Sequence, residues 1–95
     1  SLNKSESRIK LGIPIDRKII MFISESIIED ERKGAKYFFE ALNIIKSQNI
    51  INPLILLVGK IDEKKLHNFP FELINNGYIS NNNDLNLCYS ASNTL

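Results

Sequence analysis

The stretch KIIMFIS, residues 18–24, decides the fold of this chain. It is a continuous apolar run rich in β-branched isoleucine, and it lacks the alternation of apolar and polar residues that marks a half-exposed strand. Such a run is typical of a strand buried on both faces, as in a parallel sheet covered by helices. A second run of the same kind, PLILLVG, follows at residues 53–59. We therefore predict two strands of a parallel sheet.

The segment between the two runs predicts a helix over residues 32–48. Its apolar side chains recur three and four residues apart, as they do on the stripe of a helix that packs on another element. The members of this stripe are Phe38, Ala41, Leu42 and Ile45. Asn49 and Pro53 then mark the exit towards the second strand.

The remaining elements are shorter, and capping residues or prolines delimit most of them. In chain order they are a helix over residues 3–10 that Gly12 caps, a loop or short helix over 60–70, a weaker strand over either 71–74 or 77–79, and a last helix over 83–93.

This alternation of strands and helices predicts an α/β fold, with a three-stranded parallel sheet flanked by helices. Three such units make half of a doubly wound nucleotide-binding fold, which has about six strands. In the full fold the strand at 18–24 would be central, so here it lacks a neighbour. We expect residues 1–95 to be a partial domain that forms homo-oligomers or swaps elements through this exposed sheet edge.

Composition excludes several classes of function. A net charge of +1 gives no overall field that would attract nucleic acid or a membrane surface. No apolar run reaches the roughly 18 residues of a membrane span, and the first residues do not resemble a signal peptide. Cys88 is the single cysteine, which excludes an internal disulfide and favours a cytoplasmic location.

A basic pair at the predicted start of the central helix indicates an anion site. Ligands of open α/β sheets bind beyond the carboxyl ends of the strands, where helices begin. Arg32 and Lys33 are unfavourable there because the helix dipole already places positive charge at that end, and a bound phosphate would remove the conflict. Gly34 would let the phosphate approach the backbone. The alternative is that the acidic residues 29–31 balance the pair and that all five charges are solvated.

Other polar and aromatic residues favour structural interpretations. His67, the only histidine, lies in a polar loop without a second ligand at metal spacing, so we predict no metal site. We expect Cys88 to be a small buried hydrophobic residue. The aromatic residues 37–39 are expected in the core and at its rim, and the charged residues 60–65 on a solvated surface.

Four sequence marks occur in a fixed order along the chain. They are LGIP at residues 11–14, Lys33-Gly34 followed by Ala41-Leu42, Val58-Gly59 at the end of the second strand, and the turn 77–80 followed by LNLCYSA at 85–91. Together they resemble the nucleotide-sugar-binding domain of group 1, GT4-type glycosyltransferases, and the resemblance covers nearly the whole chain.

The resemblance implies the first half of the donor domain of a retaining GT-B enzyme, in which two Rossmann-like domains enclose the reaction. Such enzymes transfer a sugar from a UDP- or GDP-sugar to a saccharide or lipid-linked acceptor, as in polysaccharide biosynthesis, and they need no cofactor or metal. Carried over by position, the donor diphosphate site would be Arg32, Lys33 and Gly34, and the nucleobase site would be Gly59, Tyr78 and Ile79.

The chain also departs from the family pattern. The Gly-Arg pair that ends the first strand in many members is replaced by residues 23–26, ISES, and Arg32 is the residue that would take over its role. The later segment with paired glutamates does not occur here. We therefore expect no catalytic residue in this segment and no activity without the remainder of the enzyme, which would be cytoplasmic and peripheral at the inner membrane face.

The alternative interpretation is a flavodoxin- or receiver-like regulatory module that binds a protein partner and no nucleotide sugar. A receiver needs an aspartate at the tip of a central strand, whereas the second strand here ends in Val58-Gly59-Lys60. Neither a P-loop nor a G-x-G-x-x-G turn follows the first strand, so we set aside a dinucleotide site.

Overall fold

A computed structural model describes residues 3–24, 29–59, 63–77, 79 and 81–93, without the side chains of residues 24, 29–35, 63 and 65. Its elements are α1 (Lys4–Leu11), β1 (Ile19–Ser24), α2 (Glu29–Gln48), β2 (Leu54–Gly59), the 3-10 helix η1 (Glu63–Leu66), β3 (Leu73–Asn75) and α3 (Asn82–Ala91). The structure confirms an α/β fold with a three-stranded parallel sheet and helices.

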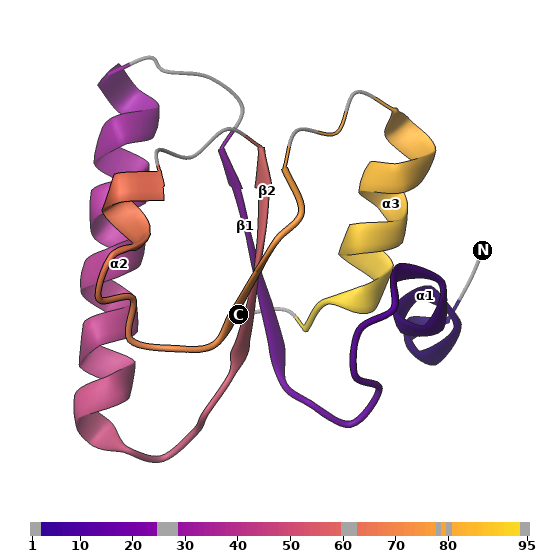
Figure 1. Ribbon diagram of the computed structural model, residues 1–95, viewed down its shortest axis with the longest axis horizontal. Coiled ribbons are helices and arrows are strands. Elements are labelled where there is room, and N and C mark those ends of the chain that lie inside the picture. Colours follow the sequence, from indigo (N-terminus) through magenta and orange to yellow (C-terminus); the bar gives the residue numbers. More distant parts are fainter. Residues whose placement is uncertain (1–2, 25–28, 60–62, 78, 80, 94–95) are drawn as a thin grey trace.

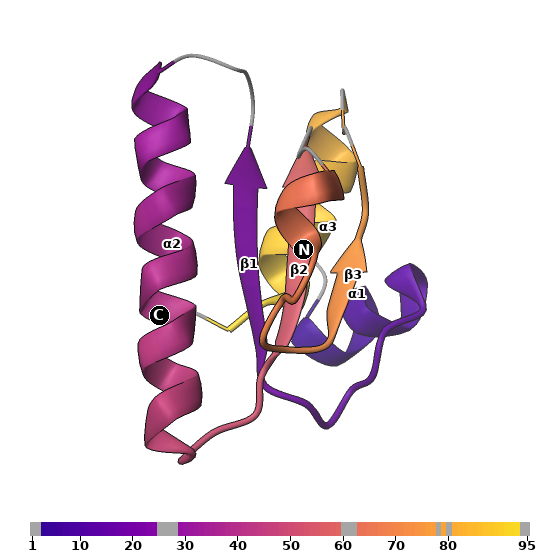
Figure 2. The same ribbon diagram turned by 60° about the vertical axis from the view of Figure 1, so that its left-hand side comes forward.

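The sheet has the order β1-β2-β3, so β2 lies between the other two strands (Figure 2). Pairing runs in register from Ile19 opposite Leu54 to Ser24 opposite Gly59. On the other side of β2, Ile55 lies opposite Leu73. The strand predicted over 53–59 is therefore the central strand among the described residues, and β1 is an edge strand.

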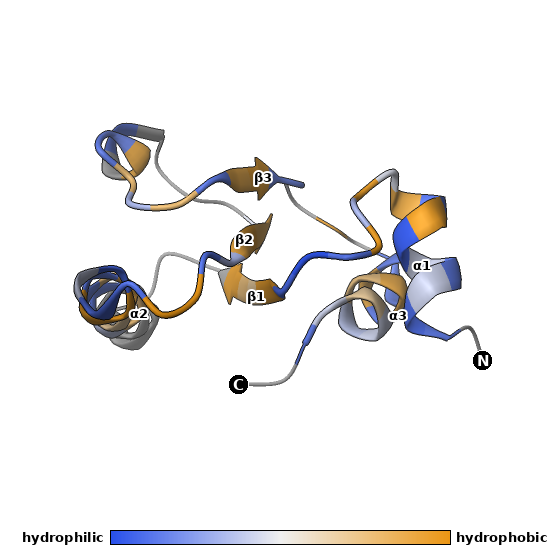
Figure 3. Ribbon diagram, turned by 90° about the horizontal axis from the view of Figure 1, so that it is seen from below, coloured by the Kyte–Doolittle hydropathy of each residue, from blue (hydrophilic) through white to orange (hydrophobic). Residues whose placement is uncertain are grey.

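The helices cover both faces of this sheet, as the apolar runs predict. In Figure 1 the sheet is seen edge-on, with α2 on one face and α1 and α3 on the other. Figure 3 shows the same three layers along the strand direction. All six residues of β2 are buried, because both of their faces meet helices.

The pleat of β2 divides the core into two clusters. Successive side chains of a strand point to opposite faces, so alternate residues of β2 join different clusters. The cluster towards α1 and α3 contains Ile13, Ile19, Leu54, Leu56, Val58, Cys88 and Ala91. The cluster towards α2 contains Ile20, Leu42, Ile55, Leu57 and Phe71, with Phe22 stacked on Phe38 at a centroid distance of 4.4 Å.

Arg8 holds α1 against the rest of the molecule. The side chain of this arginine is 3% exposed, and its guanidinium has no carboxylate partner among the described side chains. Instead, Nε donates to the carbonyl oxygen of Ala91 at 2.8 Å, Nη1 to that of Ile15 at 2.8 Å, and Nη2 to Oδ1 of Asn93 at 2.9 Å. Since Ala91 ends α3, the cation lies where the dipole of that helix is negative.

Two expectations about α2 are wrong. The helix begins at Glu29, three residues before the predicted start at Arg32. Its first turn therefore carries the acidic residues 29–31, whose charge suits the positive end of the dipole. In addition, Ala41 is exposed, whereas Phe38, Leu42 and Ile45 do face the core. The apolar stripe is therefore one residue narrower than predicted, because the face of α2 that packs on the sheet includes Phe38, Leu42 and Ile45 but not Ala41.

The shorter elements agree with their predictions to within about two residues, the usual uncertainty of helix ends. Gly12 caps α1 with φ 70°, and its backbone N–H donates to α1 carbonyls, as predicted. Asn81 caps α3 by accepting from the N–H groups of Asn83 and Asp84. The third strand is Leu73–Asn75, close to the first of its two predicted positions, and of the second position the described residues Gly77 and Ile79 lie outside any strand.

Cys88 is fully buried on the inner face of α3, as predicted for a small hydrophobic residue. Burial raises the pKa of its thiol above the ordinary value of 9.0, and the carboxylate of Asp84 raises that pKa further. The folded state therefore holds the proton more tightly than the unfolded chain does. It follows that this group stabilises the fold below about pH 9 and that the contribution is lost as the pH rises through the folded pKa.

We therefore expect the free energy of unfolding to fall above about pH 9, and to fall less steeply in Cys88→Ala than in the wild type, because the alanine variant lacks the thiol that must ionise on unfolding. Urea titrations at several alkaline pH values measure this. Comparing the two slopes cancels the titration of lysine and tyrosine side chains, which is common to both proteins. Equal slopes would contradict the expectation.

Candidate functional site

The carboxyl ends of the three parallel strands lie at one edge of the sheet, at the top of Figure 1. This is the edge where open α/β sheets bind ligands. Gly59 ends β2 with φ 107°, and its N–H donates to the carbonyl oxygen of Gly77 at 2.7 Å. Two of the three strand exits are therefore joined directly by a backbone hydrogen bond.

Gly77 makes a tight turn directly after β3. Its φ is 71°, a conformation that favours glycine, and its N–H donates to Oδ1 of Asn75 at 3.1 Å. A Cβ placed on Gly77 would meet no atom within 4 Å. The turn is thus open on the side where a side chain would project, and a ligand can approach its backbone closely.

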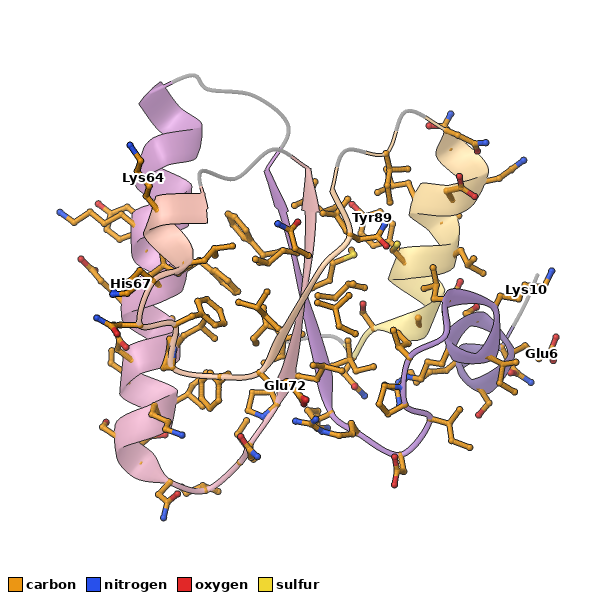
Figure 4. All side chains as sticks on the ribbon, viewed as in Figure 1. Glu6, Lys10, Lys64, His67, Glu72 and Tyr89 are labelled. Carbon is orange, nitrogen blue, oxygen red and sulfur yellow. The ribbon has the colours of Figure 1, made fainter. Side chains whose placement is uncertain are left out.

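A cavity of about 660 Å³, shallow and largely open to solvent, lies between η1 and the end of β3, and its described lining consists of Lys64, Leu66, His67 and Asn75. Its size lies within the range of small-molecule sites, roughly 300–1,000 Å³. η1 follows β2, and Asn75 ends β3, so the lining comes from the exits of two neighbouring strands. Figure 4 shows Lys64 on η1 and His67 directly after it, on the side of the sheet that α2 covers.

The polar groups of this cavity suit an anionic or strongly polar ligand. Lys64 carries a positive charge, and His67 offers ring nitrogens. The side-chain oxygen of Asn75 accepts a hydrogen bond from the N–H of Gly77. The NH₂ group of the same side chain is directed away from Gly77, and it can donate hydrogen bonds to other groups. Leu66 contributes an apolar wall, and it packs at the edge of the core cluster towards α2.

Sequence reasoning missed these residues. Lys64 and His67 are exposed, in agreement with the prediction of a solvated loop, but they also line the cavity. The available signal was their position between two buried strands, since loops at that edge carry ligands. This signal was too weak to identify the residues, because the sequence does not show which loop folds back over the sheet. That depends on tertiary structure.

The residues predicted to bind the diphosphate have a different setting from the one expected. Because α2 begins at Glu29, residues 32–34 lie about one turn inside the helix instead of at its start. The N–H groups of the first turn that lack an acceptor within the helix belong to residues 29–31, so Arg32 and Lys33 follow them and Gly34 is an interior helix residue. The side chains of Arg32 and Lys33 lie outside the described residues, and their contact with a ligand stays a prediction.

The predicted nucleobase residues are only partly brought together. Gly59 lies at the carboxyl edge as expected, and it contacts the turn at Gly77. Ile79 is half-buried and packs against the core cluster towards α1 and α3, so only its exposed part and its backbone can meet a ligand. Tyr78 lies outside the described residues.

Over the described ranges, no group of three or more histidine, cysteine, aspartate or glutamate side chains could hold a metal ion. In the same part of the chain, no helix combines the length and the apolar character that a membrane crossing requires. No family model, no curated protein and no solved structure gave a match to this chain.

Proposed function

We propose that this chain is the donor-binding part of a retaining glycosyltransferase and that it takes a nucleotide diphosphate sugar at the carboxyl edge of its sheet. In this proposal the fold is the first half of a Rossmann-like, GT-B donor domain. The remainder of the enzyme supplies the acceptor site and the groups that contact the sugar. The proposal places the protein in the cytoplasm, where Cys88 would remain reduced.

The observation that carries the proposal is the cavity between η1 and the end of β3. A nucleotide diphosphate needs cationic or N–H donors for its phosphates and an apolar wall for its base. Lys64, His67 and the NH₂ group of Asn75 offer the first, and Leu66 offers the second. The glycine turn at Gly77 adds backbone that a ligand can approach.

The diphosphate therefore has two candidate positions, and a different helix carries the basic residues at each. One is the start of α2, where Lys33 follows the first turn. The other is the cavity beside η1, where Lys64 and His67 lie. The sequence resemblance favours the first place, and the described geometry supports the second. Single substitutions at the two places separate them.

We expect UDP or GDP to shift the backbone amide signals of Gly59, Asn75 and Gly77 in two-dimensional NMR spectra of the labelled chain. Because UDP and GDP lack the sugar, we expect each nucleotide to bind with a dissociation constant on the order of 1 mM, which corresponds to a binding free energy of about −4 kcal/mol. His67→Ala should weaken binding several-fold if the diphosphate lies beside η1, and Lys33→Ala should do so if it lies at α2.

Lys10→Ala is the matched control, because Lys10 is an exposed lysine on α1, which lies across the sheet from η1. It should leave the titration unchanged, and an equal loss in this variant would indicate unspecific attraction to anions. If neither nucleotide shifts the amides of the strand exits, in this chain and in a chain extended through the rest of the domain, the proposal is wrong.

The receiver-like alternative gains no support from the described residues. A receiver places an aspartate at the tip of a central strand to accept a phosphoryl group. Here the tip of β2 is Gly59, with a positive φ and its N–H already bonded to Gly77. A residue with a side chain would be strained at this φ, so glycine at this strand end favours the backbone contact with Gly77 and disfavours an aspartate.

A further inference from the structure

We propose that the outer edge of β1 is a docking site for one extended, apolar strand supplied by another polypeptide segment. The recognition groups are the backbone N–H and C=O groups of Met21 and Ile23. This inference concerns the edge of the sheet and does not depend on nucleotide binding at its carboxyl ends.

The direction of the backbone groups follows from the pairing of β1 with β2. The N–H of Leu54 donates to the carbonyl oxygen of Lys18 at 2.8 Å, so the backbone groups of Lys18 point towards β2. Alternate residues of a strand direct their backbone groups to the same side. Those of Ile20 and Phe22 therefore also face β2, and those of Ile19, Met21 and Ile23 face away from it.

Within the described part of the chain, only the first of these three outward residues has a backbone partner on this side. Asn93, in the extended segment after α3, accepts from the N–H of Ile19 through Oδ1 at 2.7 Å and donates its own N–H to the carbonyl oxygen of Ile19 at 2.7 Å. Among the described residues, nothing pairs with Met21 or Ile23 on this side. Two donors and two acceptors are thus left, in the alternating order that an extended backbone complements.

The surroundings of the edge indicate a single strand as the occupant. α2 contacts β1 on one face and α3 contacts it on the other, so the edge lies between two helices (Figure 3). A second folded copy would bring its own flanking helices to the same place. One strand needs only the space beside β1, and in either direction it can form four hydrogen bonds with Met21 and Ile23.

The side chains at the edge define the chemistry of that strand. Met21 and Ile23 are half-buried and pack against the cluster towards α3, and Phe22 is half-buried against the cluster towards α2. A strand beside them would extend both clusters, so it should be apolar on both faces. Ile19–Ile23 contains no charged residue and no proline, which are two of the devices that protect natural edge strands from pairing.

The test uses hydrogen exchange, read residue by residue by NMR, with a terminally blocked peptide of the sequence of residues 18–24 as the probe. In the free chain, the amides of Ile20 and Phe22 should exchange slowly and those of Met21 and Ile23 rapidly. Saturating peptide should slow exchange at Met21 and Ile23 by about tenfold or more. Slow exchange of both amides in the free monomer, or no slowing with peptide, would overturn the proposal.

A matched pair of variants separates backbone pairing from side-chain contact. Met21→Pro removes the outward N–H while keeping the ladder to β2, because proline is tolerated where the N–H faces away from the sheet. Met21→Leu keeps that N–H. We expect the proline variant to bind the peptide at least about tenfold more weakly and the leucine variant to bind it as the wild type does. Equal binding by both would overturn the proposal.

A second measurement does not depend on whether the proline variant folds. The same peptide, methylated on alternate backbone nitrogens, cannot donate the hydrogen bonds, and it should give no protection at Met21 or Ile23. Protection by the methylated peptide would overturn backbone recognition. Protection that rises with protein concentration in the absence of peptide, together with a dimer in sedimentation, would overturn the single-strand occupant in favour of a second copy.

Discussion

Replacing Arg8 by alanine is expected to lower the free energy of unfolding by about 3 kcal/mol, because three hydrogen bonds of a charged donor are lost together. The carbonyl oxygens of Ala91 and Ile15 would then lie at a buried site without their donor. α1 would also lose its link to the end of α3. Urea denaturation followed by circular dichroism measures the change, and the exchange rates of α1 amides would show whether that helix separates first.

Two further variants make this prediction specific. Arg8→Lys keeps the positive charge but has no planar fork, so it cannot reach three acceptors in three directions, and we expect it to recover less than half of the loss. Lys10→Ala removes an exposed charge from the same helix and should change stability by less than about 0.5 kcal/mol. A full recovery by lysine would show that only the charge matters.

Ile55→Ala is expected to destabilise the fold by about 3 kcal/mol, the usual range for an aliphatic side chain removed from a packed core. Ile55 is 0% exposed at the centre of the middle strand, where β1 and β3 prevent the cavity from closing. A chain of this size has a small total stability, on the order of 5 kcal/mol, so the variant should be close to unfolded at 37 °C.

Ile50→Ala is the matched comparison, because it removes the same atoms at a position that is 79% exposed in the loop before β2. We expect a change of less than about 0.5 kcal/mol there. Thermal unfolding of the two variants side by side measures the difference. Similar losses would mean that β2 is not the centre of the core, contrary to its burial on both faces.

The strands were predictable from the sequence because each signal is local and strong. An uninterrupted apolar run such as IIMFI can be hidden from water only by elements on both faces, which requires a parallel sheet within helices. The caps at Gly12 and Asn81 were equally local, since each depends on one residue type at one turn. The start of α2 was misjudged because the acidic residues 29–31 were placed before the helix, although their charge suits a first helical turn.

Tertiary structure alone decided the burial of Arg8 and the composition of the cavity. In the sequence, α1 has the composition of a surface helix, and nothing marks Arg8 apart from Lys4 or Lys10. Two of its three acceptors lie at Ala91 and Asn93, more than 80 positions along the chain, and only the packing of α1 on α3 brings them within reach. The same holds for His67 and Asn75, which the return of the chain from η1 to β3 places around one cavity.

The sequence by itself therefore determined the class of the fold and the number and direction of the strands, whose carboxyl ends share one edge of the sheet. These follow from short-range patterns of burial and capping, which each segment carries independently of the others. Which side chains meet at that edge, which strand edge stays open and which charge is buried depend on contacts between distant segments. A local sequence pattern does not specify those contacts, because the same helices and strands can pack in several arrangements that leave the same side chains exposed or buried.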